Sequence, residues 1–335
     1  MTEALLAVED LRVRFATEDG IVGAVDGVSF DLGAGEVLAI VGESGCGKSV
    51  TSQTMMGLTR SPNARIEGSV RYRGAELLTA DDATLRGIRG PEMSMIFQDP
   101  ISALNPVYRV GDQIVEAIRA HEEISEHAAK QRATELLGLV GIPDPSRRVD
   151  EYPHEFSGGM RQRAMIAMAL SLEPTILIAD EPTTALDVTI QAQILELMRR
   201  LRRDYGSSIL IITHDMGVVS DLAERVVVMY AGSVVEEGPK RAVFRDPQHP
   251  YTWGLLGSIP RIGRTRSRRL AVIPGQPPSL LAPPRGCRFA PRCAYRFPAC
   301  EARPALLPRV AANHSDACHL DPAVRPELRL ERRSA

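Results

Sequence analysis

The sequence predicts an α/β fold built around a mainly parallel β-sheet. Residues 37–41, 175–179 and 208–213 are short apolar runs, typical of parallel strands that are buried on both faces. Helical stretches follow the first two runs, at about residues 49–56 and 189–203. Because buried strands alternate with helices, we expect a parallel sheet that binds its ligand at the carboxyl ends of its strands.

Residues 5–41 have the pattern of an antiparallel β region that feeds this sheet. Residues 11–15 alternate between apolar and polar side chains, and residues 18–20 carry a turn signal. Phe15 ends that alternation. A phenylalanine is ordinarily a core residue, but at the edge of a pocket it offers a flat face on which an adenine ring can stack.

A glycine loop at residues 42–49 fits the pattern G-x-x-x-x-G-K-S/T between a predicted strand and a predicted helix. This order aims backbone N–H groups and a helix N-terminus at one point, where a phosphate is stabilised. Lys48 would add a positive charge at the β- and γ-phosphates, and the Ser49 hydroxyl would hold Mg²⁺. The other loop residues expected to bind the nucleotide are Gly42, Ser44, Gly45 and Gly47. The alternative is a glycine-rich turn that matches the pattern by chance.

Cys46 lies inside the glycine loop, beside Lys48 and near the start of the predicted helix. A positive charge and a helix N-terminus both favour the thiolate form of a cysteine. We therefore expect a reactive thiol here, with a cysteine that merely fits a small-residue position as the alternative.

Three polar residues that follow predicted strands are candidates for catalysis. Asp180 and Glu181 come after the run 175–179; Asp180 would ligate Mg²⁺ through water, and Glu181 would orient and activate the attacking water. His214 follows the run 208–213 and would contact a phosphate, whereas a lone histidine is usually structural.

Gln98 is a fourth candidate, because it follows the apolar run 93–97 directly. Asp99-Pro100 then ends the strand, since proline cannot donate a ladder hydrogen bond. Near a phosphate site this glutamine would contact Mg²⁺ or water. Taken alone, it would be an ordinary surface amide.

A second glycine-containing segment opens the helical stretch that runs to residue 172. Ser157 is a residue type favoured at the N-cap, and Gly158 and Gly159 leave the first N–H groups of the helix exposed. These features predict a second anion-binding element. A capped helix with a flexible start is the alternative.

Residues 245–335 form a proline- and arginine-rich extension in which periodicity fades. Between residues 241 and 310 there are 13 arginines, no lysine and two acidic residues. Such a stretch can dock on nucleic acid, anionic lipid or an acidic protein surface. A solvated arginine-rich surface without a partner is the alternative.

Four of the five cysteines lie in this extension, as Cys287, Cys293, Cys300 and Cys318. Disulfides are not expected in a chain without a secretion signal. Four thiolates can hold Zn²⁺ or a 4Fe–4S cluster, and the lack of a C-x₂-C pair and the surrounding arginines favour the cluster. Unligated thiols are the third alternative, and His314 and His319 are spare candidate ligands.

The 335-residue chain contains no apolar run near the length that crosses a bilayer. Its first ten residues carry acidic side chains and no basic segment, which does not fit a signal peptide. We expect a cytoplasmic protein whose membrane contact comes through a partner.

Six motifs within residues 15–240 occur in the order found in ABC-transporter nucleotide-binding domains, and the sequence resembles that family. They are the glycine loop, Gln98, the 156–160 motif, Asp180-Glu181, Ala185-Leu186-Asp187 and His214. Phe156 stands where leucine is commoner, a change not expected to disturb phosphate contacts. In finer detail the chain is similar to the oligopeptide/dipeptide import subfamily. The segments that carry this likeness are 96–100, 104–106, 154–163, 249–252, Gly286-Cys287 and Pro291-Arg292-Cys293.

The resemblance implies a P-loop ABC domain with a helical subdomain and a cysteine-bearing C-terminal extension. Residues 1–98 and 161–244 would form the ATP-binding core with its β subdomain, residues 99–160 the helical subdomain that meets the permeases, and residues 245–335 the extension. Phe15 would stack on adenine, and Asp187 would lie between subunits. The residues implied to complete a partner's ATP site are Ser157, Gly158, Gly159 and Gln162.

The resemblance also implies an ATP-hydrolysing subunit that uses ATP and Mg²⁺ to power import of peptides or a related small solute. Its partners would be a second ATPase subunit, in a heterodimer, two transmembrane permeases and an extracytoplasmic substrate-binding protein, with no nucleic acid. It would lie at the cytoplasmic face of the membrane. The sequence does not determine the solute, because the binding protein and the permeases select it.

Two other functions fit a P-loop sequence less well. Soluble ABC ATPases of DNA repair or translation usually fuse two nucleotide domains or carry coiled-coil or zinc insertions, and this chain has neither. The Ser-Gly-Gly motif and His214 argue against a GTPase or a kinase.

Overall fold

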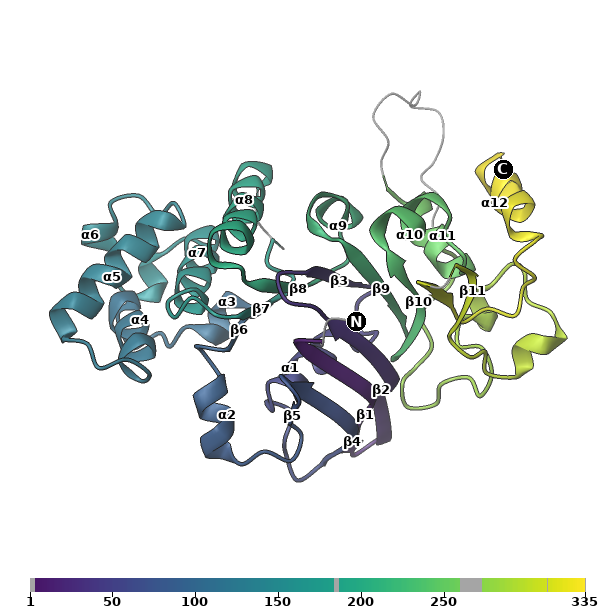
Figure 1. Ribbon diagram of the computed structural model, residues 1–335, viewed down its shortest axis with the longest axis horizontal. Coiled ribbons are helices and arrows are strands. Elements are labelled where there is room, and N and C mark those ends of the chain that lie inside the picture. Colours follow the sequence, from purple (N-terminus) through teal and green to yellow (C-terminus); the bar gives the residue numbers. More distant parts are fainter. Residues whose placement is uncertain (1–3, 184–186, 260–272, 312, 335) are drawn as a thin grey trace. The chain divides into compact units, whose positions relative to one another are not determined.

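The computed structural model describes residues 4–183, 187–259, 273–311 and 313–334. The chain divides into two compact units, each assembled from separate segments. The first comprises Met1–Leu5, Leu32–Val37 and Thr79–Ile212, and the second Leu6–Asp31, Leu38–Leu78 and Thr213–Ala335. Each unit is described by itself, and elements keep the labels of Figure 1.

Parallel strands form the core of the first unit. β7 (Ile176–Asp180) pairs with β6 (Met93–Ile96) on one side and with β8 (Ser208–Thr213) on the other. Every residue of β7 and β8 is buried, as the two apolar runs in the sequence predict. Ala179 stands opposite Ile96 and Ile211, so these strands end at the same level.

Helices make up the rest of the first unit (Figure 1). They are α2 (Asp82–Ile88), α3 (Pro100–Ala103), α4 (Val110–Arg119), α5 (Glu126–Leu139), α6 (Pro145–Arg148), α7 (Gly158–Ala169) and α8 (Val188–Tyr205), with a 3₁₀ turn at Pro153–Glu155. α4 begins against Val149, and a Cβ on Gly111 would lie 2.4 Å from the Val149 carbonyl oxygen. α8 ends where Gly206 takes a positive φ of 70°.

The second unit contains an antiparallel sheet with the strand order β2-β1-β4-β5. Its strands are β1 (Leu6–Thr17), β2 (Gly20–Leu32), β4 (Ala64–Tyr72) and β5 (Ala75–Glu76). The apolar side chains of β1 alternate toward the buried face, which confirms the predicted β region. An irregularity between Glu9 and Arg12 interrupts its pairing with β4, and Asp10 there takes a positive φ of 46°.

A second group of strands in this unit carries the glycine loop. β3 (Val37–Val41) runs parallel to β9 (Arg225–Tyr230), which forms a hairpin with β10 (Ser233–Pro239). The two-residue turn of the hairpin, Ala231-Gly232, has positive φ at both positions, as two-residue hairpin loops often do. The helices of the unit are α1 (Lys48–Met55), α9 (Met216–Leu222), α10 (Lys240–Arg245), α11 (Pro250–Gly257) and α12 (Arg325–Ser334).

The C-terminal extension adds strands to this group. β12 (His314–Asp316) pairs with β10, and β11 (Leu307–Ala311) pairs with β12. Two 3₁₀ turns, Ala290–Arg292 and Pro298–Glu301, precede them. The extension therefore completes the second unit.

Buried charges hold the extension in place. The Glu236 carboxylate, which is fully buried, accepts hydrogen bonds from the backbone N–H groups of Gln248 (2.7 Å) and His249 (2.8 Å). His314 Nε2 lies 2.8 Å from the same carboxylate. A second buried pair joins Arg325 to Asp316 at 3.0 Å. Removing one partner of the buried Arg325–Asp316 ion pair would leave an uncompensated buried charge, so this pair stabilises the packing of the extension.

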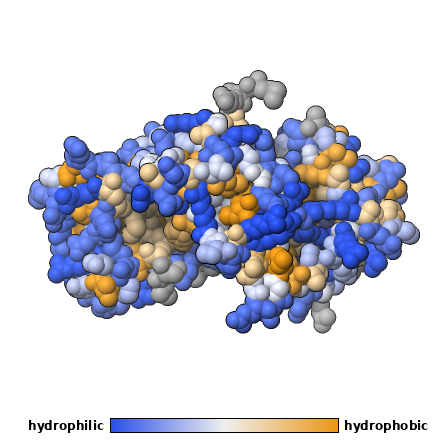
Figure 2. Space-filling view, turned by 90° about the horizontal axis from the view of Figure 1, so that it is seen from below, coloured by the Kyte–Doolittle hydropathy of each residue, from blue (hydrophilic) through white to orange (hydrophobic). Residues whose placement is uncertain are grey.

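No helix in the described parts of the chain is long and apolar enough to cross a membrane. On the face seen in Figure 2, hydrophobic residues form separate groups among mainly hydrophilic ones. The most exposed large hydrophobic side chains among the described residues include Val188 (83%), Val107 (72%) and Ile21 (63%).

The buried imidazole of His249 predicts a loss of stability in acid. Its Nδ1 accepts the Tyr251 backbone N–H at 3.1 Å and caps α11, and burial, followed by the nearby positive charge of Arg325, lowers the pKa of His249 to about 3. An unfolded histidine binds a proton near pH 6.5, so this contribution is complete above about pH 6.5 and is lost as the pH falls toward 3, at about 1.4 kcal/mol per pH unit.

We expect denaturant unfolding to show that protonation of this histidine lowers the free energy of unfolding by about 2 kcal/mol between pH 7 and pH 5. His249→Asn keeps an acceptor at the helix cap and should flatten that dependence. The exposed His154, changed to Asn, is the matched control and should behave as wild type. Equal pH dependence in all three proteins would contradict the prediction.

Candidate functional site

The glycine loop between β3 and α1 is held so close to neighbouring backbone that two of its positions exclude any side chain. A Cβ on Gly42 would lie 2.3 Å from the Met229 carbonyl oxygen, and one on Gly47 would lie 2.3 Å from that of Ala24. Gly47 also has a φ of 99°, which L-residues rarely adopt, and it is the N-cap of α1. These contacts fix the loop as a backbone cradle of the kind that binds phosphate.

Lys48 is the charged group of this loop. Its side chain is 4% exposed, and its Nζ donates to the carbonyl oxygens of Gly42 (2.9 Å) and Glu43 (3.1 Å). The ammonium therefore lies within the loop, where its charge faces the loop's own backbone. Ser44 and Gly45 are exposed, and Ser49 is partly exposed in the first turn of α1.

Phe15 and His214 belong to the same unit as the loop. Phe15 is half-buried on β1, opposite Ala64 of β4. His214 is exposed and follows the last residue of β8 directly. Both positions leave the ring with a face or an edge toward solvent, as a ligand contact requires.

Gln98 and Glu181 lie in contact in the first unit. The sequence predicts only that each of them follows a strand. Gln98 Nε2 donates to Glu181 Oε2 at 3.2 Å, so its amide oxygen is the atom that could ligate a metal. Asp180, the last residue of β7, is 1% exposed, and Glu181 is 8% exposed. Glu181 has a φ of 49° and donates its N–H to the Ile212 carbonyl oxygen at 2.8 Å. A left-handed conformation in a glutamate stores strain, a common property of functional residues.

Ser157 caps α7 as the sequence predicts, and its hydroxyl accepts the Met160 N–H at 3.3 Å. Ser157 and Gly158 are exposed, so the N-terminal end of the helix faces solvent. Gln162 lies one turn further on, is 2% exposed, and donates to the Pro182 carbonyl oxygen at 3.0 Å. This amide connects α7 to the segment that follows Asp180 and Glu181.

Asp187 is exposed and caps α8, and its carboxylate accepts the Ile190 N–H at 2.9 Å. The preceding residues of the predicted motif, Ala185 and Leu186, lie outside the described residues.

The expectation of a reactive Cys46 is wrong. The side chain is 4% exposed, and burial raises the pKa of the Cys46 thiol although the charge of Lys48 acts to lower it. Its backbone oxygen is also bonded to the Gly232 N–H at 2.9 Å. The sequence shows the neighbouring charge but not the burial, and burial is the larger effect.

The four cysteines of the extension are not arranged around a common metal site. Cys287 and Cys293 flank the 3₁₀ turn Ala290–Arg292, Cys300 lies in the turn Pro298–Glu301, and Cys318 follows β12. Among the described residues, no three histidine, cysteine, aspartate or glutamate side chains are placed to hold a metal. The structure thus does not support the predicted 4Fe–4S cluster or the zinc alternative.

The pKa values of two of these thiols also disfavour the thiolate form that binds a metal. Burial, together with the neighbouring Cys300, raises the pKa of Cys287, and burial raises the pKa of Cys318 to about 12. Both groups are therefore protonated in this arrangement. His314 and His319, the spare candidate ligands, bond instead to Glu236 and to the Ala302 carbonyl oxygen.

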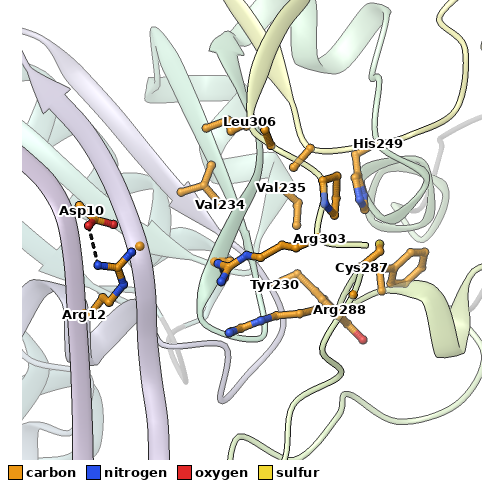
Figure 3. A pocket seen from close by; sticks show the side chains of 17 residues that line it. Asp10, Arg12, Tyr230, Val234, Val235, His249, Cys287, Arg288, Arg303 and Leu306 are labelled. Carbon is orange, nitrogen blue, oxygen red and sulfur yellow. Dashed lines mark hydrogen bonds and ion pairs between the residues drawn. The ribbon is translucent and has the colours of Figure 1, made fainter. Parts of the chain in front are cut away.

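A cavity of about 530 Å³ lies beside Cys287 in the second unit (Figure 3). Apolar side chains from β9, β10 and the extension line it, together with three arginines. Of these, Arg288 and Arg303 both bind the Asp26 carboxylate. Burial alone would raise the pKa of Asp26, but the charges of Arg303 and Arg288 outweigh it and lower that pKa. These two arginines of the basic stretch thus neutralise an acid of their own chain.

Sequence reasoning missed the side chains that contact Glu43, the second residue of the glycine loop. The Tyr251 hydroxyl accepts the Glu43 N–H at 2.8 Å, and Arg292 pairs with the Glu43 carboxylate at 2.5 Å. More than 200 residues separate each partner from the loop, and no local pattern could have indicated the pairing.

The two units define the class of protein to which the chain belongs. A glycine loop on a strand–helix turn, a buried Asp-Glu pair after a parallel strand and a serine-capped helix with an exposed N-terminus are the parts of a P-loop ATPase of the ABC type. The family model described as "ABC transporter" matches residues 25–184, and that described as "Oligopeptide/dipeptide transporter, C-terminal region" matches residues 235–300.

Curated relatives narrow the assignment. The dipeptide transport ATP-binding protein DppD of Bacillus subtilis is 55% identical over 89% of this chain and 89% of its own length. The oligopeptide transport ATP-binding protein OppD of the same organism is 55% identical over 87% of this chain and 82% of its own length. The solved structure of the ATP-binding cassette MJ0796, dimeric and bound to ADP and Pi, is 27% identical, with a TM-score of 0.64 over 70% of this chain and 99% of its own. The chain belongs to the ABC-transporter ATP-binding subunits, in the oligopeptide/dipeptide importer subfamily, and is an ATPase of that type.

Proposed function

We propose that this protein is the ATP-hydrolysing subunit of an importer for dipeptides, oligopeptides or a related small solute. The observation that carries the proposal is the glycine loop, which is shaped for phosphate by two positions that admit only glycine. The matching C-terminal region and the relatives named for dipeptide and oligopeptide transport support the choice of cargo. ATP and Mg²⁺ are the cofactors of such an ATPase.

The proposed ATP site is assigned residue by residue. Gly42, Ser44, Gly45, Gly47 and Lys48 hold the phosphates, and Phe15 stacks on the adenine. The oxygen donors of Ser49, Gln98 and Asp180 are of the type that Mg²⁺ prefers, and the ion would neutralise charge on the transferring phosphate. Glu181 takes the proton of the attacking water on a carboxylate oxygen, and Gln98, bonded to that carboxylate, orients it. His214 contacts the γ-phosphate.

We further propose that the exposed start of α7 completes the ATP site of a second subunit. Ser157, Gly158 and Gly159 present their backbone there, and Asp187 lies at the same junction. Because the Gln162 side chain is buried, we assign it to holding the Pro182 segment rather than to contacting nucleotide. The related cassette with a dimeric structure supports a pair of subunits.

The remaining partners are proposed from the subfamily. They are a second, similar ATPase subunit, two transmembrane permeases and an extracytoplasmic substrate-binding protein, with this chain at the cytoplasmic face of the membrane. In the division we propose, residues 1–98 and 161–244 form the ATP-binding core, residues 99–160 the helical subdomain, and residues 245–335 the extension. The exposed Val107 (72%) and Tyr108 (57%) lie in this helical subdomain and offer apolar contacts for a permease.

The extension's cysteines remain proposed ligands of a 4Fe–4S cluster, with zinc as the alternative. The support comes from the sequence, where four cysteines lie within 32 residues and the arginines around them would offset the negative charge of a cluster bound by four thiolates. A bound cation would favour thiolates that burial otherwise disfavours. The role would be structural, since nothing in the ATPase reaction needs a redox centre.

Replacing Glu181 tests the proposed mechanism. Glu181→Gln should leave ATP binding intact and reduce turnover of the assembled transporter by at least about two decades, as expected for losing a positioned base. Phosphate release and nucleotide binding measure the two effects. The exposed Glu196→Gln is the control and should turn over normally. A near-normal rate in Glu181→Gln would refute the assignment.

Co-purification tests the proposed partnership. The single subunit should hydrolyse ATP slowly, because the start of α7 would contribute to a site that needs a second subunit. Activity should rise when a second ATPase subunit and two permeases are co-expressed, and should rise further with a peptide-loaded binding protein. Fast cooperative hydrolysis by the isolated subunit, or failure to isolate permeases with it, would count against the proposal.

Metal analysis tests the proposed cluster. Anaerobic purification should give a brown protein that absorbs near about 400 nm and carries about four irons per chain. The colour should be lost in Cys293→Ser and retained in Cys46→Ser. One zinc and no iron per chain would contradict the cluster and support the zinc alternative. A protein with neither metal would contradict both hypotheses.

A further inference from the structure

An arginine of the C-terminal extension contacts the glycine loop directly. Arg292 lies in the 3₁₀ turn between Cys287 and Cys293, and its Nη1 and Nη2 donate to the two carboxylate oxygens of Glu43 at 2.5 and 3.0 Å. This bidentate geometry is the strongest form of an arginine–carboxylate pair. The Arg292 side chain is 5% exposed and that of Glu43 is 26% exposed, so solvent screens the pair only weakly.

The guanidinium is fixed by further contacts. Its Nε donates to the Pro274 carbonyl oxygen at 2.9 Å, and its Nη2 donates to that of Ile273 at 3.3 Å. Nη1 lies 3.3 Å from the Tyr230 hydroxyl, and the guanidinium carbon is 5.8 Å from the centre of the Tyr230 ring. All three nitrogens of Arg292 are therefore engaged, and its position is set by the extension and β9 together.

Glu43 is held at each of its polar groups. Its N–H donates to the Tyr251 hydroxyl at 2.8 Å, its carbonyl oxygen accepts from Lys48 Nζ at 3.1 Å, and its carboxylate binds Arg292. The next two residues, Ser44 and Gly45, are exposed. The first half of the loop is thus anchored at Glu43 by Tyr251 and Arg292 from outside the loop and by Lys48 within it.

We propose that Arg292 is a positioning residue of the ATP site, through which the C-terminal extension sets the affinity of the glycine loop for nucleotide. This inference rests on the proposed role of residues 42–49 in holding ATP. Two effects contribute. The ion pair holds the backbone of Glu43, and hence the direction of the loop's N–H groups, and it neutralises a carboxylate that would otherwise repel the phosphates.

The two effects predict how variants of the full-length protein behave in the assembled transporter. Arg292→Ala should raise the KM for MgATP by roughly tenfold, within the range for coupled contacts, and change kcat less than about twofold. Arg292→Lys should fall between wild type and Arg292→Ala, because lysine keeps the charge but lacks the planar fork. The double variant Glu43→Gln, Arg292→Ala should regain part of the affinity, because it removes the unpaired charge.

Arg303→Ala is the matched control, since Arg303 also ties the extension to the second unit, through Asp26, and touches no loop residue that the structure describes. Its KM should equal that of wild type. A KM for Arg292→Ala no higher than for Arg303→Ala would overturn the inference, as would a double variant as weak as Arg292→Ala. Should Arg292→Ala fail to fold, as judged by circular dichroism, the KM of Arg292→Lys decides: a wild-type value overturns the inference.

Lys48→Ala separates this inference from the proposed function. It should abolish measurable binding of MgATP whatever Arg292 does. If Lys48→Ala binds MgATP normally, the proposed ATP site itself is wrong. If Lys48→Ala fails to bind while Arg292→Ala behaves like Arg303→Ala, only the role of Arg292 is refuted.

Discussion

The close packing of glycine backbone on neighbouring backbone is the constraint on which the second unit depends. Gly47 touches the Ala24 carbonyl oxygen of β2, and Gly232 in the β9–β10 turn approaches the same oxygen, where a Cβ would lie only 2.9 Å away. The Gly232 N–H bonds to the Cys46 carbonyl oxygen at 2.9 Å. One point therefore joins the antiparallel sheet, the hairpin and the phosphate loop, and a side chain at either glycine would force them apart.

That packing also explains the chemistry of the loop. Because the loop is held against β2 and β9, Cys46 is enclosed and loses the reactivity that its neighbouring charge would favour. Lys48 is enclosed too, but its ammonium is paired with carbonyl oxygens of the loop itself. A buried ammonium needs such partners, and the carbonyl oxygens of Gly42 and Glu43 provide them.

Several arginines of the basic extension form ion pairs with carboxylates of the same chain, which the composition of the extension does not indicate. Arg288 and Arg303 bind Asp26, Arg292 binds Glu43, and Arg325 binds Asp316. Arginine suits these sites because its planar group can bond two oxygens at once and remains charged when buried. The sequence shows the arginines but not the partners of Arg288 and Arg292, because Asp26 and Glu43 lie 262 and 249 residues away from them.

The sequence by itself determined the parts of this protein that depend on neighbouring residues. The parallel strands, the glycine loop, the cap at Ser157 and the hairpin across Ala231-Gly232 all follow from local hydrophobicity, glycine conformation and hydrogen-bonding capacity. Tertiary structure alone decided what depends on burial and on distant partners. It buried Cys46 and Gln162, joined Gln98 to Glu181, and placed Arg292 on the glycine loop. Burial and long-range pairing depend on how segments far apart in the chain, from 83 residues for Gln98 and Glu181 to 249 for Glu43 and Arg292, pack together, and no local pattern in the sequence encodes that packing.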